Sequence, residues 1–244
     1  MNELVVISPH HDDLGFSVPL LLSTWSKLGL SLKFITCFTY SNYAPNKIGL
    51  SSQEVTKIRQ QEDQEFLLKL GSKHPQINLG LLDAPLRLKC SSDLTCKRKF
   101  NEVDLQEAIH LSLQLKDKIG MGSILAPLGL GNHIDHLIVL HACMLLSPDR
   151  SIIFYEDLPY AAEISFQEIL NNVESIARKI KRPLKSILYK NTDAVKQKKQ
   201  FANIYRSQIT EKDLYNLVQY TRNLGGERIW TDSKTQENLK IIEK

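Results

Sequence analysis

Apolar and polar positions follow one another along the first two thirds of the chain in a pattern that predicts alternating strands and helices. Residues 4–8 form a short β-branched run ended by Pro9, and a continuous apolar run of this length is typical of a strand buried on both faces. Residues 15–28 carry apolar side chains at helical spacing, and Gly29 ends that helix. Residues 32–39 are predicted as the second strand. Such a β-α-β unit predicts parallel strands joined by a right-handed crossover.

The alternation continues to about residue 155. Ser51 and Glu54 match a capping box, so we expect a helix from there to residue 70, ended by Gly71. Loops are predicted at residues 41–50, 83–95 and 128–134, strands at 76–82, 123–127 and 151–155, and helices at 101–119 and 136–146.

This alternation argues for an α/β fold with a mostly parallel, Rossmann-like sheet and helices on both faces. The last third is mostly helical, with helices predicted at residues 192–206 and 210–222 and an edge strand at 228–230. The sequence shows no linker that would divide the chain and no internal repeat. We therefore expect a single domain over residues 1–244.

Composition narrows the class of protein. Hydrophobic residues make up 42% of the 244 positions and charged residues 24%, which is ordinary for a globular protein. The net charge of +4 is too small to argue for nucleic acid as a partner. The basic residues between positions 178 and 199 are explained by a solvated helix face. The sequence has no stretch with the length and apolarity of a membrane span.

Four cysteines bear on the compartment. Cys37 and Cys143 lie in apolar segments and are predicted to be buried, whereas Cys90 and Cys96 flank a polar loop and could pair under oxidising conditions. The first apolar run, at residues 4–7, is too short for a signal-peptide core. We therefore expect a cytoplasmic protein with reduced thiols.

Two turns carry most of the side chains suited to catalysis. One follows the first predicted strand, the other follows the fourth, and four of the seven histidines lie in them. Ligands bind open α/β sheets beyond the carboxyl ends of the strands, so both turns are expected to face one crevice. Their polar residues are His10, His11, Asp12 and Asp13, and then Asn132, His133, Asp135 and His136.

Three of these residues have the chemistry and spacing of zinc ligands. Zinc binds imidazole nitrogen and carboxylate oxygen, and a catalytic zinc has three protein ligands and one position open to water. His10 and Asp13 stand three apart at a strand-to-helix turn, so both side chains can point into one pocket, and His136 supplies a third ligand from the neighbouring turn. The same mixed ligand set also suits Fe²⁺ or Co²⁺.

The other polar residues suit amide hydrolysis at such a metal. Asp12 is a free carboxylate that can take a proton from the metal-bound water and return it to the leaving amine. His133 is suited to stabilise the oxyanion as an imidazolium, with Asp135 orienting its ring. A structural interpretation stays open for the first turn, because Asp12 or Asp13 could cap the following helix.

The two turns, in this order, resemble the motifs of the LmbE-like, or PIG-L, deacetylases. That family carries His-x-Asp-Asp after the first strand and His-x-x-His later, and residues 10–13 and 133–136 match both. The family's Arg-x-x-Glu helix is matched from Arg59, and its Ser-Gln element at residues 207–208. The resemblance extends over roughly residues 4–230.

The resemblance implies a zinc-dependent N-deacetylase acting on an amino sugar or a similar conjugate. It implies His10, Asp13 and His136 as zinc ligands, Asp12 as general base and His133 as oxyanion stabiliser. It also implies a small-molecule partner, an N-acetylated sugar or conjugate, and is compatible with a homo-oligomer.

Two further positions are candidates for binding substrate. Arg59 matches a family position near the substrate, where its guanidinium could clamp a carboxylate, phosphate or sugar hydroxyl; the alternative is an ion pair with Glu62 on the helix surface. Asp83, at the end of the third predicted strand, could bind substrate hydroxyls; the alternative is an Asx turn that begins the loop.

The chain departs from the family pattern beside the first motif. Leu14 stands where many members have Glu, and His11 stands where Pro is usual. Because that Glu is not a metal ligand in the family, the zinc site should survive. His11 is expected to face solvent rather than to bind the metal.

Two rival functions stay open. The first is a catalytically silent relative that binds a glycan or regulates a partner, to which only Leu14 points. The second is a zinc hydrolase of another amide or an ester, because the metal chemistry does not require an N-acetyl group.

Overall fold

The computed structural model describes residues 3–71 and 75–240, and within them the chain forms one seven-stranded sheet. The strands lie in the order β3-β2-β1-β4-β5-β7-β6. The first five strands in this order are parallel to one another, whereas β7 runs antiparallel to both β5 and β6. The strands are β1 Leu4–Ser8, β2 Leu32–Thr36, β3 Gln76–Asn78, β4 Ser123–Pro127, β5 Ile152–Tyr155, β6 Lys185–Lys190 and β7 Gly226–Thr231.

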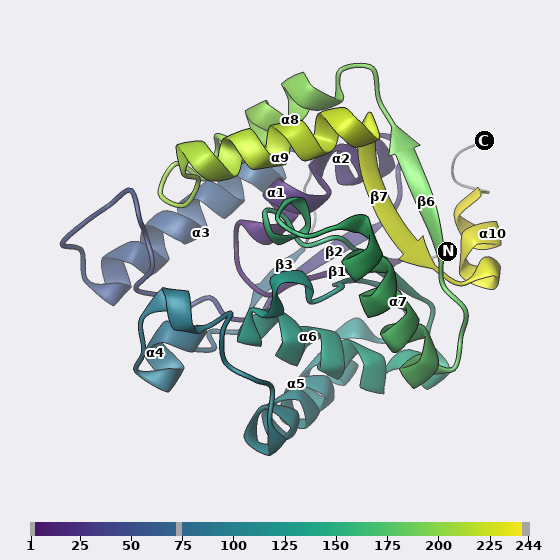
Figure 1. The fold of residues 1–244 in the computed structure, drawn as a ribbon, viewed down its shortest axis with the longest axis horizontal. Coiled ribbons are helices and arrows are strands. Elements are labelled where there is room, and N and C mark those ends of the chain that lie inside the picture. Colours follow the sequence, from purple (N-terminus) through teal and green to yellow (C-terminus); the bar gives the residue numbers. More distant parts are fainter. Residues whose placement is uncertain (1–2, 72–74, 241–244) are drawn as a thin grey trace.

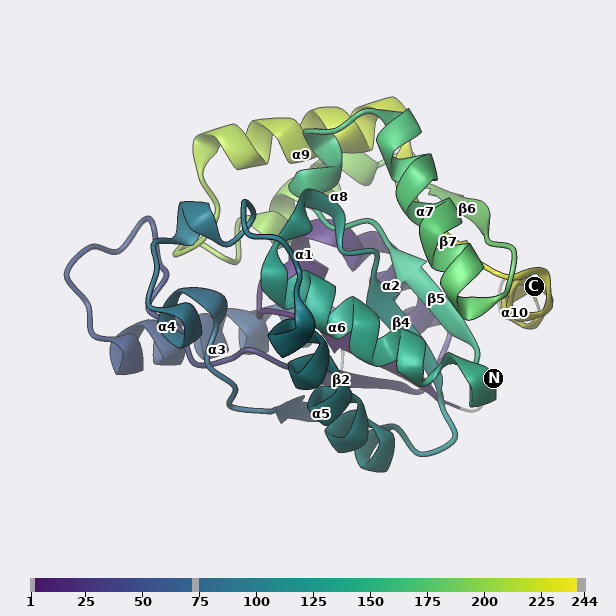
Figure 2. The same ribbon diagram turned by 60° about the horizontal axis from the view of Figure 1, so that its bottom comes forward.

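Helices cover both faces of this mixed α/β sheet (Figures 1 and 2). Helix α8 packs against α1, α2 and α9 on one face, and α5 packs against α6 on the other. The helices are α1 Asp13–Ser17, α2 Pro19–Lys27, α3 Ser52–Lys69, α4 Ala84–Leu88, α5 Glu102–Ile119, α6 Ile134–Leu145, α7 Phe166–Ile180, α8 Ala194–Ala202, α9 Glu211–Leu224 and α10 Ser233–Lys240.

The central strands and their caps confirm the pattern-based predictions. Every residue of β1 is buried, as expected for a strand covered on both faces. Ser51 accepts the backbone N–H of Glu54, and the Glu54 carboxylate accepts the backbone N–H of Ser51 in return. This capping box begins α3 at the predicted place.

Several predicted boundaries were wrong, among them the end of the second strand, which lies at Thr36 rather than at residue 39. Three others have a clear local reason. The helix expected at residues 15–28 is two helices, because Pro19 lacks the N–H that would continue α1 and instead begins α2. The third strand ends at Asn78 rather than at residue 82, because Gly80 adopts a positive φ of 74° that ends extended pairing. The loop expected from residue 83 begins with the short helix α4, capped by Asp83.

The largest difference lies in the last third of the chain. The sequence interpretation assigned no element between residues 156 and 191, where the structure has α7 and β6. Ser165 and Glu168 form a capping box at the start of α7, a signal present in the sequence but not used. The strand expected at the edge, at residues 228–230, is part of β7, which lies between β5 and β6. Strand β6 is the edge, with alternating exposure.

No helix in the described part of the chain is both long enough and apolar enough to cross a bilayer. All four cysteines are free thiols, so Cys90 and Cys96 are not paired.

A buried ion pair fixes α8 to the end of α1. The Nζ of Lys198 lies 2.6 Å from Glu227 Oε1 and donates to the carbonyls of Phe16 and Ser17 at 3.0 and 2.8 Å. Both charged side chains are almost fully buried, at 0% and 2% exposure. Glu227 also accepts the backbone N–H of Leu20. The pair therefore connects β7 and α8 to α1 and α2, the helices that follow residues 10–12.

Replacing Lys198 by methionine should lower the free energy of unfolding by about 3–5 kcal/mol, because it leaves the Glu227 carboxylate buried without its cation. Denaturant unfolding followed by circular dichroism measures this loss. Lys199→Met changes an exposed lysine of the same helix and should stay within about 0.5 kcal/mol of the parent protein. Equal stability of the two variants would contradict this account of the pair.

Candidate metal centre and its cavity

Three predicted ligands meet at the carboxyl ends of β1 and β4. His10 lies in the turn after β1, Asp13 begins α1, and His136 lies in the first turn of α6. His10 Nδ1 lies 3.4 Å from Asp13 Oδ2, and His136 Nε2 lies 3.3 Å from Asp13 Oδ1. One ligand atom from each residue falls within 4.8 Å of the others, and all three residues are buried. The chain therefore has a His/Asp cluster able to bind a metal ion.

Each histidine of the cluster has its second ring nitrogen bound by a buried carboxylate. His10 Nε2 lies 3.0 Å from Asp135 Oδ2, and His136 Nδ1 lies 2.6 Å from Asp157 Oδ1. Both carboxylates have fully buried side chains. Such partners fix the ring orientation and the tautomer of a metal-binding histidine, so the nitrogens facing Asp13 are the ones that can bind a metal.

The Asp135 carboxylate binds the ring of His10 rather than the ring of His133, which only the Asp135 backbone N–H contacts, and this corrects the prediction. Its carboxylate also accepts the backbone N–H of Ala84 at 2.8 Å and Arg87 Nη2 at 2.8 Å. Both oxygens of the carboxylate are therefore already bound, by His10, Arg87 and the backbone of Ala84. The physical reason is that α4 and its Arg87 lie against this side of α6, an arrangement that the prediction of a loop at residues 83–95 did not anticipate.

His10, His133 and Asp135 form a second group with suitable spacing. This group fits a metal less well, because the Asp135 carboxylate is already bound by a guanidinium and a backbone amide.

The cluster stabilises positive charge even without a metal. Burial alone would lower the pKa of His10, but hydrogen bonds and charge from Asp13 and Asp135 raise that pKa to about 9. Burial likewise opposes the charged form of His136, and Asp13 and Asp157 together raise its pKa above the usual value. A bound metal cation would satisfy the same carboxylates.

His133 differs from the other two histidines. It is the N-cap of α6, and its Nδ1 accepts the backbone N–H of Asp135 at 3.3 Å. Because Nδ1 accepts, the hydrogen of the neutral ring is on Nε2. Burial lowers the pKa of His133 to about 3. The predicted imidazolium is therefore not the resting form, and the ring is a neutral donor.

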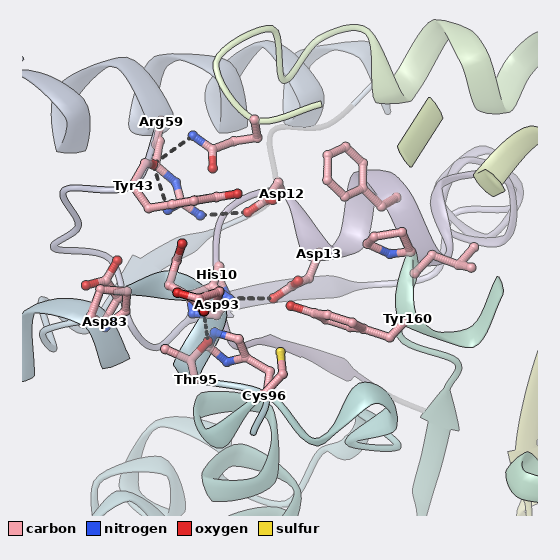
Figure 3. A pocket seen from close by; sticks show the side chains of 17 residues that line it. His10, Asp12, Asp13, Tyr43, Arg59, Asp83, Asp93, Thr95, Cys96 and Tyr160 are labelled. Atoms are coloured by element: carbon pink, nitrogen blue, oxygen red, sulfur yellow. Dashed lines mark hydrogen bonds and ion pairs between the residues drawn. The ribbon is translucent and has the colours of Figure 1, made fainter. Parts of the chain in front are cut away.

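Asp12 is held by Arg59. Arg59 Nη2 donates to Asp12 Oδ1 at 2.7 Å (Figure 3). Its Nη1 donates to Ser41 Oγ at 2.9 Å. The alternative ion pair between Arg59 and Glu62 was wrong, because Glu62 binds the backbone N–H and the hydroxyl of Ser207. Asp12 occupies the N-cap position of α1 but makes no capping hydrogen bond, so its carboxylate is available for another role.

His10, Asp12, Asp13, Arg59 and His133 line one cavity of about 300 Å³. Figure 3 shows Asp12, Asp13 and His10 in its wall, with Arg59 and Tyr43 from one side and Tyr160 from another. The wall also contains Tyr43 and Asp93, from the two polar loops at residues 40–46 and 83–93 that could supply hydrogen bonds to a sugar, and Gln208, from the Ser-Gln element. Thr95, Cys96 and Tyr160 were not identified from the sequence as site residues. These residues lie in loops and short 3-10 helices whose approach to the site depends on tertiary packing.

Asp83 lies in the cavity wall and also caps α4. Its Oδ1 accepts the backbone N–H of Leu86 at 3.3 Å, and the residue is 2% exposed. One oxygen of Asp83 therefore has the structural role given by the alternative interpretation, because it caps the turn that begins here.

The two departures from the family pattern lie outside the cavity lining. Leu14 is buried in the hydrophobic core. His11 is also buried, at 1% exposure, and its Nδ1 lies 2.9 Å from Asp63 Oδ2, so the prediction of a solvent-facing His11 was wrong. Asp63 also accepts the Tyr205 hydroxyl at 3.1 Å. This buried group explains why a polar ring is tolerated at position 11.

Asp157 is the site residue that the sequence interpretation missed most directly. It lies two residues beyond β5, whose carboxyl end meets the same edge of the sheet as those of β1 and β4. An acidic residue directly after a parallel strand was a usable signal.

No family model matches the chain. The chain is 27% identical over 233 residues to a 2'-N-acetylparomamine deacetylase from Streptomyces fradiae, an alignment that covers 93% of this chain and 80% of that protein. This similarity supports the predicted resemblance to deacetylases.

Two solved structures share the fold. A deacetylase of the teicoplanin biosynthesis pathway superposes with a TM-score of 0.70 at 19% identity, covering 93% of this chain and 96% of that one. A structure described as the zinc-inhibited form of teicoplanin deacetylase Orf2 gives a TM-score of 0.65 at 18% identity, covering 93% and 97%. Together with the sequence relative, these structures confirm the resemblance to the LmbE-like deacetylases.

Proposed function

We propose that the chain is a metal-dependent N-deacetylase that removes the acetyl group from the amine of an amino sugar or a similar conjugate. The observation that carries the proposal is the placement of Asp12, which lies beside the three-residue cluster with one oxygen bound by Arg59. The similarity to a 2'-N-acetylparomamine deacetylase supports the choice of bond and of substrate class.

We assign His10, Asp13 and His136 as the metal ligands. Two imidazoles and one carboxylate suit zinc, and Fe²⁺ could also use them. When bound, zinc would act as a Lewis acid and lower the pKa of water in the cavity. The ligand set fits this ion because both imidazoles are oriented by buried carboxylates, Asp135 and Asp157.

Asp12 acts as the general base and then as the general acid. Arg59 binds Oδ1, so the second oxygen is available to take a proton from water and to deliver it to the leaving amine. Arg59 is therefore a positioning residue for Asp12 as well as part of the cavity wall. Its guanidinium keeps the carboxylate in one orientation, which a flexible surface aspartate would lack.

His133 stabilises the oxyanion as a neutral donor. Its Nε2–H is available because Nδ1 accepts from the backbone of Asp135. A donor already oriented before the reaction contributes most when charge develops on the carbonyl oxygen. Asp135 acts through His10, which it orients, rather than on the substrate.

Substrate hydroxyls are proposed to contact Arg59 and Asp83. Both lie in the cavity wall, and both also make internal contacts that restrict their movement.

The strand order 3-2-1-4-5 of the parallel part supports the finer description of the sheet as Rossmann-like. We propose one domain over residues 1–244 and a cytoplasmic location with reduced thiols, which the four free cysteines support.

The zinc-loaded protein should release acetate and free amine in equal amounts from N-acetylated amino sugars, and a chelator should stop the release. Matched O-acetyl sugars and N-acyl thiol conjugates test the rival hydrolases in parallel. Hydrolysis of only the esters would overturn the assignment of the bond. Sugar binding without any hydrolysis would favour the silent relative, although the burial of Leu14 outside the cavity removes the feature that pointed to it.

A further inference from the structure

The side-chain amide of Gln208 has one atom with no partner. Gln208 lies in the cavity wall and is only 5% exposed. Its Nε2 donates to the carbonyl of Tyr43 at 3.1 Å and to Ser207 Oγ at 2.8 Å. Its Oε1 is buried and accepts no hydrogen bond from any residue that the structure describes. Native proteins rarely leave such an atom unpaired, so a ligand is the natural donor.

The orientation of this amide is fixed by its neighbours. The Tyr43 carbonyl can only accept, so it must face Nε2 and not Oε1. Ser207 Oγ donates its one hydrogen to Glu62 at 2.6 Å, so it too can only accept from Gln208. Both hydrogens of Nε2 are therefore used, and exchanging the two amide atoms would place oxygen against oxygen. The free atom is the acceptor.

A second unpaired atom lies on the neighbouring side chain. Arg59 Nε is buried and, within the described residues, has no acceptor. Arg59 and Gln208 meet at one atom, because Arg59 Nη1 also donates to the Tyr43 carbonyl, at 3.5 Å. The same part of the wall thus offers one free acceptor and one free donor. A hydroxyl can satisfy both kinds of atom, whereas an ammonium can only donate.

We propose that Gln208 is a specificity-determining residue that accepts a hydrogen bond from a sugar hydroxyl of the substrate. Arg59 Nε donates to a hydroxyl of the same sugar. This inference rests on the proposed function, since it places an amino sugar in the cavity. It adds a residue that selects hydroxylated sugars over acylated amines that lack hydroxyl groups.

The test measures equilibrium binding of D-glucosamine and its 3-, 4- and 6-deoxy analogues to the zinc-loaded protein, by ligand-observed NMR. These amines contain no acetyl group and are not consumed. The protein should bind glucosamine about five to ten times more tightly than one of the deoxy analogues, as expected for one lost hydrogen bond. Gln208→Met should weaken glucosamine binding by a similar factor. The variant should bind that deoxy analogue as tightly as the parent protein does.

Ser207→Ala provides the matched control. It removes one of the two acceptors of Gln208 Nε2 but keeps the Tyr43 carbonyl, which still fixes the orientation of the amide, so it should retain the preference for glucosamine over the deoxy analogue. Retention of that preference in Gln208→Met, or equal binding of all four sugars by the parent protein, would overturn the proposal. Tighter binding of an analogue with an amino group in place of the hydroxyl would overturn the choice of hydroxyl.

Acetate release from N-acetylglucosamine is measured on the same samples. Acetate release without discrimination among the four sugars would reject the role of Gln208 and leave the deacetylase assignment standing. Discrimination without acetate release would reject the deacetylase assignment and leave the role of Gln208 standing.

Discussion

Replacing Asp12 by asparagine should lower kcat by about 100- to 10,000-fold, the range attributed to general acid–base catalysis by a positioned side chain. The amide of asparagine keeps the size of the side chain and an acceptor for Arg59 Nη2, but it cannot take the proton of water. Zinc affinity should be almost unchanged, because Asp12 is not one of the three clustered ligands.

Acetate release at saturating substrate and zinc content by atomic absorption measure the two effects separately. Asp117→Asn, an exposed carboxylate on α5, is the matched control and should keep the parent kcat. An Asp12→Asn protein with bound zinc and full activity would refute the role of Asp12.

Replacing Asp13 by asparagine should weaken zinc binding more than 100-fold. Asp13 lies between both histidines of the cluster, 3.4 Å from His10 Nδ1 and 3.3 Å from His136 Nε2, and supplies the negative charge among the three ligands. Removing a residue that hydrogen-bonds to a metal ligand typically lowers metal affinity 10- to 100-fold. Removing the charge of a ligand itself should therefore lower zinc affinity by more than that. Competition with a chromogenic chelator measures the affinity.

Asp63→Asn is the control for Asp13→Asn, because it changes a buried carboxylate that is not a metal ligand. Asp63 is 4% exposed and binds His11, Gln76 and Tyr205, but it belongs to neither metal-ligand group. This variant should lose stability and keep the zinc affinity of the parent protein. Similar losses of zinc affinity in both variants would mean that Asp13 acts through stability alone.

Local sequence signals were sufficient for the part of the fold that holds the site. The buried run of β1 and the capping box at Ser51 depend on neighbouring residues, and both were predicted at their observed places. The course of residues 156–191 was not predicted, because β6 pairs only with β7, a strand that comes about forty residues later in the chain. Its half-exposed edge position gives a weak hydrophobic signal.

In the site, too, some features could be predicted from the sequence and others depend on contacts between distant residues. His10, Asp13 and His136 follow strands whose ends share one edge of the sheet, so their convergence could be predicted from parallel topology alone. The orienting role of Asp135 could not, because it depends on which side chain α4 presents to it. Gln208 lies far along the chain and is held at the cavity by its own contact with Tyr43 and by the contact of its neighbour Ser207 with Glu62, which no local pattern encodes.

The most direct test of the account is a zinc titration of the metal-free protein with acetate release from an N-acetylated amino sugar as the readout. The account predicts that activity rises in proportion to added zinc up to one equivalent, that Asp13→Asn shows no such rise at these concentrations, and that Asp12→Asn binds the equivalent without gaining activity. Acetate release by the metal-free protein at the rate of the zinc-loaded one would contradict the account.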